Sequence, residues 1–278
     1  MTSIIELSRT ICPRLIKDLL LMLFSPTYRK HRQRITMICM QTQGRIASGP
    51  FMGMHYAKKA YGSQLIPQLA GTYELELRYV IADIQAYSYT TMVDIGAGEG
   101  YYAVGLARTL PSASVICFEQ HRPSSQLLKN VAMANDVVGR LVILGRCDVD
   151  ALSRVLTQHS KREARTLVIC DVEGFESVLL DPVSVPALAK SDILVELHGE
   201  AIAAQIRLRF EPTHFISAIR SRPRVDSDWP SGLKMPGDDV VECMNEYRAP
   251  QEWFWMKAIL CEKTDEPVDK IRPGKINI

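Results

Sequence analysis

Residues 92–100 constrain the fold of this chain more than any other stretch of its sequence. They read M-V-D-I-G-A-G-E-G, an apolar run that stops in three closely spaced glycines. The run at 91–95 is typical of a buried parallel strand, and the apolar residues at 101–110 recur at helical spacing. The glycines are therefore expected to form the turn between a strand and a helix. Such a turn lets a ligand approach the backbone, because glycine has no Cβ and the amides at the helix start point toward the ligand.

Beyond this turn, strand-like apolar runs alternate with segments of helical periodicity. The runs lie at 91–95, 113–118, 141–145, 166–170 and 192–197. This alternation predicts an α/β fold with a doubly wound, mostly parallel sheet and right-handed crossovers. Ligands of such sheets bind at the carboxyl ends of the strands. The residues that follow the runs are therefore expected to converge in space.

Polar residues follow every one of these predicted strands. Glu119 comes nineteen residues after Gly100, where an acid would chelate the two hydroxyls of a ribose. The third strand ends in R-C-D at 146–148, which could meet an adenine edge. The fourth ends in D-V-E-G-F-E from Asp171, and the fifth in H-G-E from His198. These ends predict a pocket for an adenosine-bearing ligand beside a more acidic pocket, although an acid at a strand end can also cap the next helix.

The glycine turn also discriminates between two adenosine cofactors. A dinucleotide turn, G-x-G-x-x-G/A, needs a small sixth residue for close packing of helix against strand, and here that residue is Tyr101. A nicotinamide oxidoreductase is therefore disfavoured. Asp94 at the strand end can instead orient the amino-acid part of S-adenosylmethionine through the turn.

Four segments carry a resemblance to a known family. V-D-I-G-A-G-E-G-Y-Y, F-E-Q, D-V-E-G-F-E and V-E-L-H, in this order and spacing, resemble the class I S-adenosylmethionine-dependent methyltransferases of the FkbM-like family. The likeness covers residues 71–260. It implies a Rossmann-like, doubly wound seven-stranded sheet whose last strand is antiparallel, with further strands at 215–220 and 254–260. It also implies O-methylation of a hydroxyl on a small molecule, a sugar or a secondary metabolite, with S-adenosylhomocysteine as product.

By resemblance, the strand-end acids and the glycines would contact the cofactor. Glu74 is open to two interpretations: it could favour the dipole of a helix expected from Thr72 to about Tyr87, or it could face the cofactor. The predicted cofactor-binding residues are Asp94, Gly96, Ala97, Gly98, Gly100, Tyr101, Glu119, Gln120, Cys147, Asp148, Asp171 and Glu74.

Three residues are candidates for catalysis. By resemblance, Asp171 and Glu173 lie where the methyl group meets its acceptor. His198 has a reference pKa of about 6.5, which suits a general base at neutral pH, although a strand-end histidine is as often structural. The three could also hold a divalent metal. No metal is expected, however, because the sequence has no compact ligand motif.

The N-terminal part of the chain differs in charge from the rest. Residues 1–62 carry ten Lys or Arg but only the acids Glu6 and Asp18, against a net charge of +2 for the whole chain. An amphipathic helical pair at 3–24 could cover the main domain, form a homodimer or, less commonly, rest on a membrane. We expect an extension over 1–70, a methyltransferase domain over 71–263 and a polar tail over 264–278. Loops at 49–61 and 222–237 are expected to shape the acceptor pocket.

Composition narrows the remaining alternatives. The seven cysteines form no C-x-x-C pair, which favours small buried thiols in a reducing compartment and predicts a cytoplasmic protein. No nucleic-acid-binding pattern accompanies the basic segment. The alternative to an enzyme is a non-catalytic adenosyl-ligand-binding or scaffolding protein that uses its basic N-terminal helices to engage a membrane or a protein partner.

Overall fold

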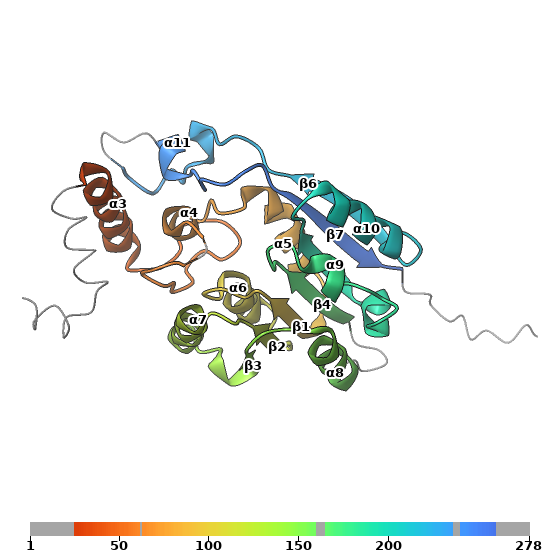
Figure 1. Cartoon of the computed structure of the whole chain (residues 1–278). Helices are drawn as coiled ribbons and strands as arrows, with labels where there is room; N and C mark the ends of the chain where they lie inside the picture. The colour runs from red at the N-terminus through yellow and green to blue at the C-terminus, as the bar shows by residue number, and fades with distance from the viewer. Residues whose placement is uncertain (1–24, 62, 160–164, 236–239, 260–278) are drawn as a thin grey trace, which may run out of the picture.

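The structure, a computed structural model, describes residues 25–61, 63–159, 165–235 and 240–259, and these contain a seven-stranded sheet (Figure 1). Its strand order is β3-β2-β1-β4-β5-β7-β6, in which β7 runs antiparallel to both β5 and β6 and the other neighbouring strands pair in parallel. The predicted fold class is therefore confirmed. The expected helical pair at 3–24 and the tail at 264–278 lie outside the described residues. The strands are β1 (Tyr89–Ile95), β2 (Ser114–Phe118), β3 (Leu141–Leu144), β4 (Arg165–Cys170), β5 (Asp192–Glu196), β6 (His214–Arg220) and β7 (Glu252–Ala258).

Two hydrophobic clusters lie on opposite faces of this sheet. Alternate strand residues divide between them, so that Met92 belongs to one cluster and Val93 to the other. The first cluster takes in α3 (Pro26–Thr42), α4 (Leu65–Ala70), α5 (Arg78–Gln85), α6 (Tyr101–Thr109) and α7 (Arg122–Ala134). The second takes in α8 (Val149–His159), α9 (Glu176–Leu179) and α10 (Glu200–Phe210). The remaining short helices are α11 (Val240–Cys243), η1 (Leu75–Leu77), η2 (Val138–Arg140), η3 (Pro186–Lys190) and η4 (Asp226–Asp228).

Two helices begin at places that the sequence analysis did not give. α3 begins at Ser25-Pro26, directly after the range of the expected helical pair: the Ser25 hydroxyl accepts a hydrogen bond from the Tyr28 amide at 3.2 Å, and Pro26 occupies the first turn. The helix expected from Thr72 begins only with η1 and α5. Thr72 does not act as its cap, because its buried hydroxyl has no hydrogen-bond partner, and Glu74 adopts a left-handed conformation with φ 44°.

The described part of the N-terminal extension packs into the core of the sheet domain. Phe51 is buried against α6, where a Cβ on Gly105 would lie 2.5 Å from the Phe51 ring. Asn135, after α7, accepts a hydrogen bond from the His55 amide and donates one to the His55 carbonyl. The segment around Phe51 therefore lies beside the glycine turn, from which α6 starts. Among the described helices, none is long and apolar enough to cross a membrane.

Candidate functional site

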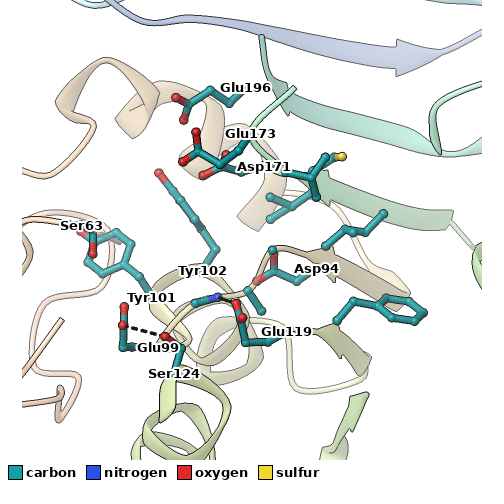
Figure 2. Close-up of a pocket in the computed structure, with 18 of the residues that line it drawn as sticks. Ser63, Asp94, Glu99, Tyr101, Tyr102, Glu119, Ser124, Asp171, Glu173 and Glu196 are labelled. Atoms are coloured by element: carbon teal, nitrogen blue, oxygen red, sulfur yellow. Dashed lines mark hydrogen bonds between the residues drawn. The ribbon is translucent and has the colours of Figure 1, made fainter. Parts of the chain in front are cut away.

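A cavity of about 820 Å³ opens at the carboxyl ends of the parallel strands. It lies where β1 and β4 are neighbours and the strand order reverses direction, the place where open α/β sheets bind ligands. Figure 2 shows Asp94 and Glu119 in one part of the cavity, beside the turn that follows β1. It shows Asp171, Glu173 and Glu196 gathered in another part. The sequence predicted such a division into a cofactor side and an acidic side.

The three glycines of the turn have different surroundings. Gly96 has φ 85°, and a Cβ there would lie 1.8 Å from the carbonyl oxygen of Asp171, so only glycine lets the turn approach the end of β4. Gly98 has φ 52° and open space around its Cβ position. Gly100 does not line the cavity and instead packs on α7, with its Cβ position 3.0 Å from Leu128.

Two acids flank this turn. Glu119 holds two loops together, because its carboxylate accepts hydrogen bonds from the Gly98 amide at 2.9 Å and from the His121 amide at 2.6 Å. Each carboxylate oxygen keeps a further lone pair for a ligand. Asp94 is 3% exposed, and its burial, together with the charges of Asp171 and Glu119, raises its pKa to about 7. A ligand cation beside Asp94 would offset that cost of burying a charge.

The ends of β2 and β3 and the turn after β1 form another part of the lining. Three residues predicted to contact the cofactor line it: Ala97, Gln120 and Cys147. Asp148 does not line the cavity: its carboxylate accepts a hydrogen bond from the Ala151 amide at 2.8 Å and so caps α8. The other lining residues there are Phe118, Gly145, Arg146 and Phe175, and the Arg146 guanidinium lies 5.8 Å from the centre of the Phe175 ring.

Glu74 faces the cavity, the second of its two sequence interpretations. Its carboxylate accepts hydrogen bonds from the Tyr102 hydroxyl and from Arg248, the latter at 2.7 Å. Tyr101 also lines the cavity and packs edge-on against Tyr102, with ring centres 5.3 Å apart. Tyr101, at the start of α6, therefore belongs to an aromatic cluster that includes Phe51, whose ring centre lies 5.2 Å from that of Tyr101.

The catalytic candidates converge at the ends of β4 and β5. The Nε2 atom of His198 lies 3.9 Å from Asp171 Oδ1 and 3.4 Å from Glu173 Oε2. It also lies 3.7 Å from Glu196 Oε1, and its Nδ1 bonds to Glu176 Oε1 at 2.7 Å. The three predicted residues thus meet, and two acids that the sequence reasoning did not single out join them.

The closely spaced carboxylates help to raise the pKa values of three residues in this cluster. The hydrogen bond to Glu176 and the nearby acids raise the pKa of His198 to about 9 against the opposing effect of burial. The shift favours the protonated form of His198 in the free protein, whereas a general base needs the neutral form. Burial and neighbouring acids, Glu74 among them, raise the pKa of Asp171 to about 7 and that of Glu196 to about 8.

The two loops expected to shape the acceptor pocket differ in position. From the loop at 49–61, Tyr56 and Tyr61 line the cavity, and the Tyr61 amide donates to Glu99 Oε1 at 2.8 Å. None of the described residues of the loop at 222–237 lines it. In that loop the Trp229 indole donates to the Leu233 carbonyl oxygen and packs on the core, so it anchors the loop.

Several functional candidates were missed from the sequence. Glu196 had a detectable signal, because in V-E-L-H it stands two residues before His198, and residues two apart in a strand share a face. Glu99 stands between two glycines of the turn and Tyr102 two residues after the last of them, where neither residue type by itself indicates a ligand contact. Arg248 and Trp253 had no local signal: Arg248 contacts the lining residues Glu74 and Glu196 from the segment before β7, and Trp253 lines the cavity from β7 itself.

No protein-family model and no curated protein matches this chain. Among solved structures it is similar to an S-adenosylmethionine-dependent O-methyltransferase from Thermotoga maritima, with 12% identity, 66% of each chain covered and a TM-score of 0.38. A precorrin-6y C5,15-methyltransferase from Geobacter metallireducens shows 10% identity over 64% of this chain and 85% of that one, with a TM-score of 0.43. The O-methyltransferase TomG from Streptomyces achromogenes, solved with S-adenosylmethionine, shows 13% identity over 67% and 80%, with a TM-score of 0.40.

These neighbours are methyltransferases of more than one kind. The present chain spans about two thirds of the first of them. At this degree of likeness the comparisons choose neither an acceptor nor a subfamily, and the FkbM-like resemblance stays a prediction.

Proposed function

We propose that this protein is an S-adenosylmethionine-dependent methyltransferase that methylates a hydroxyl of a small molecule. The observation that carries the proposal is one cavity at the strand-order reversal, which joins the glycine turn and its two flanking acids to the acid cluster at the ends of β4 and β5. The first part suits an adenosyl ligand and the second offers groups for an acceptor.

The lining fits such a cofactor. Gly98 leaves open space at the turn, Asp94 is a buried acid in need of a cation, and Glu119 is held where it can meet two ribose hydroxyls. When bound, S-adenosylmethionine supplies a methyl group on a sulfonium, and transfer to an acceptor oxygen breaks the carbon–sulfur bond and leaves S-adenosylhomocysteine. The protein then needs to align the acceptor and accept one proton from its hydroxyl; alignment alone can contribute roughly 7–11 kcal/mol.

Groups for these tasks surround the acidic part of the cavity. Asp171 and Glu173 follow β4 directly beside the glycine turn, and His198 faces both of them. Tyr73 and Trp253 supply apolar walls there, with the Arg248 guanidinium 5.2 Å and 5.9 Å from their ring centres. We propose that this part holds the acceptor hydroxyl against the methyl group.

The test is a methyl-transfer assay with labelled S-adenosylmethionine on a panel of glycosides, phenols and amino-acid derivatives. We expect label in a hydroxyl-bearing compound, with kcat lowered at least tenfold by Asp171→Asn. Glu211→Gln, on the exposed end of α10, is the matched control and should keep full activity. Tight cofactor binding without turnover on any acceptor would instead support the non-catalytic binding protein. Label in amines alone would contradict O-methylation and retain methyl transfer.

A further inference from the structure

Three side chains at the ends of β4 and β5 form a set of cation ligands. One oxygen each from Asp171 and Glu196 and one nitrogen of His198 all lie within 4.8 Å of one another. His198 Nε2 lies 3.9 Å from Asp171 Oδ1 and 3.7 Å from Glu196 Oε1. Ligands about 2.0–2.2 Å from a tetrahedral cation lie about 3.4 Å apart, so small side-chain movements would bring these atoms into coordination.

His198 is already oriented as a metal ligand. Its Nδ1 donates to Glu176 Oε1 at 2.7 Å, and Glu176 is fully buried. That carboxylate is held in turn by the amides of Val172, at 3.3 Å, and Gly174, at 3.1 Å. A carboxylate on one ring nitrogen fixes the tautomer and aims the other nitrogen at a metal. Here Nε2 is aimed at three carboxylates.

Glu196 supplies a second, independent sign of a missing partner. Its side chain is 4% exposed, and its buried Oε2 atom has no hydrogen bond. The Arg248 Nη1 atom forms an ion pair with that oxygen at 3.5 Å without a hydrogen bond, while its Nη2 atom donates to Glu74 and Glu246 at 2.7 Å each. Asp171 Oδ1 likewise has no hydrogen bond. Buried carboxylates whose oxygens lack hydrogen bonds are costly, and a divalent cation between Asp171 and Glu196 would offset the charge of both groups.

We propose that Asp171, Glu196 and His198 bind one divalent cation of the kind that accepts mixed oxygen and imidazole ligands, such as Mn²⁺ or Zn²⁺. Glu173 is 86% exposed with its Oε2 atom 3.4 Å from His198 Nε2, and it can swing in as a fourth ligand. The remaining positions face the cavity. The cation's role, to hold the acceptor oxygen beside the methyl group, rests on the proposed function; its binding does not.

This proposal departs from the sequence expectation that no metal is bound. That expectation followed from the absence of a compact motif, and the motif is indeed not compact: the first two ligands come from different strands, and only Glu196 and His198 are close in the sequence. The parallel pairing of β4 with β5 brings them together.

The test is direct binding of Mn²⁺ to the full-length chain after dialysis against a chelator. The signal of free Mn²⁺ in electron paramagnetic resonance, followed during titration, gives stoichiometry and affinity without any methyl acceptor. We expect one Mn²⁺ per chain, displaced by Zn²⁺, and at least tenfold weaker binding in Glu196→Gln and in Asp171→Asn. Glu211→Gln should bind as the unaltered chain does. Circular dichroism checks that each variant folds. If Glu196→Gln does not fold, Asp171→Asn, whose side chain is partly exposed, still tests the proposal.

Two results would overturn the proposal: no stoichiometric binding of Mn²⁺ or Zn²⁺ at millimolar concentration, or binding that is unchanged in both folded variants. A parallel calorimetric titration with S-adenosylhomocysteine separates this failure from failure of the proposed function. Cofactor binding without cation binding would contradict the proposed cation site and leave the proposed function unaffected. Cation binding without cofactor binding would leave the site standing and remove the methyltransferase.

Discussion

Gly96 and Gly98 belong to one turn but bear different constraints. Both have positive φ, yet a Cβ at residue 96 would meet the Asp171 carbonyl oxygen at 1.8 Å, whereas a Cβ at residue 98 would meet nothing within 4 Å. We expect Gly96→Ala to lower the free energy of unfolding by roughly 2–4 kcal/mol, since it adds backbone strain and overpacking. Gly98→Ala should cost only about 1–2 kcal/mol. Urea unfolding measures both, and equal losses would contradict the assigned contact.

Asp94 is predicted to lower the stability of the free protein and to strengthen cofactor binding. Its pKa rises from 3.8 to about 7 on folding, so the folded protein holds a proton that the unfolded chain has released, and this contribution to stability is lost as pH rises from about 4 to about 7. Asp171 and Glu119 face it and add to the shift. Asp94→Asn should therefore raise the free energy of unfolding at pH 8 by roughly 2–4 kcal/mol and flatten its pH dependence.

The same variant should weaken cofactor binding. We expect the affinity of the unaltered chain for S-adenosylhomocysteine to fall as pH drops from 8 to 6, because protonated Asp94 no longer attracts the ammonium group. In Asp94→Asn the affinity should be lower and less dependent on pH. Calorimetry at three pH values checks this, and an affinity that stays pH-dependent in the variant would assign the titration to another group.

At the scale of elements, one buried acid joins four strands at the end of the sheet opposite the cavity, where the parallel strands begin. Asp192, in β5, accepts hydrogen bonds from the Tyr89 hydroxyl at 2.7 Å, from Arg165 at 3.2 Å and from the Ala258 amide at 2.9 Å. Removal of the carboxylate by Asp192→Ala leaves these donors unpaired and should cost roughly 3–5 kcal/mol. Tyr89→Phe removes one donor and should cost about 1–2 kcal/mol. Chemical denaturation distinguishes the two, and a larger loss in Tyr89→Phe would refute this account.

The contact between the N-terminal segment and α6 is a second prediction at this scale. A Cβ on Gly105 would press on the Phe51 ring at 2.5 Å, so Gly105→Ala should cost roughly 1–3 kcal/mol despite the better helix propensity of alanine. In a Phe51→Leu background the cost should shrink or change sign. A double-mutant cycle measures this coupling, and additive effects would show that the two residues are not in contact.

The elements were predictable to different degrees. The apolar run, the turn glycines and the helical spacing of apolar residues predicted β1 and α6 closely, because each depends on local pattern. The start of α3 was not predicted, because serine followed by proline can end one helix or begin another, and the hydrogen bond of the Ser25 hydroxyl is what marks the beginning. The helix expected from Thr72 starts later because Gly71 is pressed against the Ser48 carbonyl, with its Cβ position 2.0 Å from that oxygen, a tertiary contact that local sequence does not contain.

For the whole molecule, the expectation that ligands bind at the carboxyl ends of the strands located the candidate site correctly. It did not identify every residue of the site. Asp94 lies at the end of β1, Glu119 and Asp171 follow β2 and β4, and all three were predicted to meet and do line one cavity. Asp148 also follows a strand, but its side chain turns to the α8 amides. Arg248 enters from a loop far along the chain. Sequence patterns thus could not predict which way a side chain points, or which residues distant in the sequence lie close to the site.

The central claim is that the cavity at the strand-order reversal binds an adenosyl cofactor through the glycine turn and Glu119. Calorimetric titration of the full-length chain with S-adenosylhomocysteine tests it most directly. We predict saturable binding at one ligand per chain, weakened about 10- to 100-fold by Glu119→Gln, the equivalent of about 1.4–2.8 kcal/mol, and no saturable binding of NAD. No binding of S-adenosylhomocysteine, or equally tight binding by the folded Glu119→Gln variant, would contradict the claim.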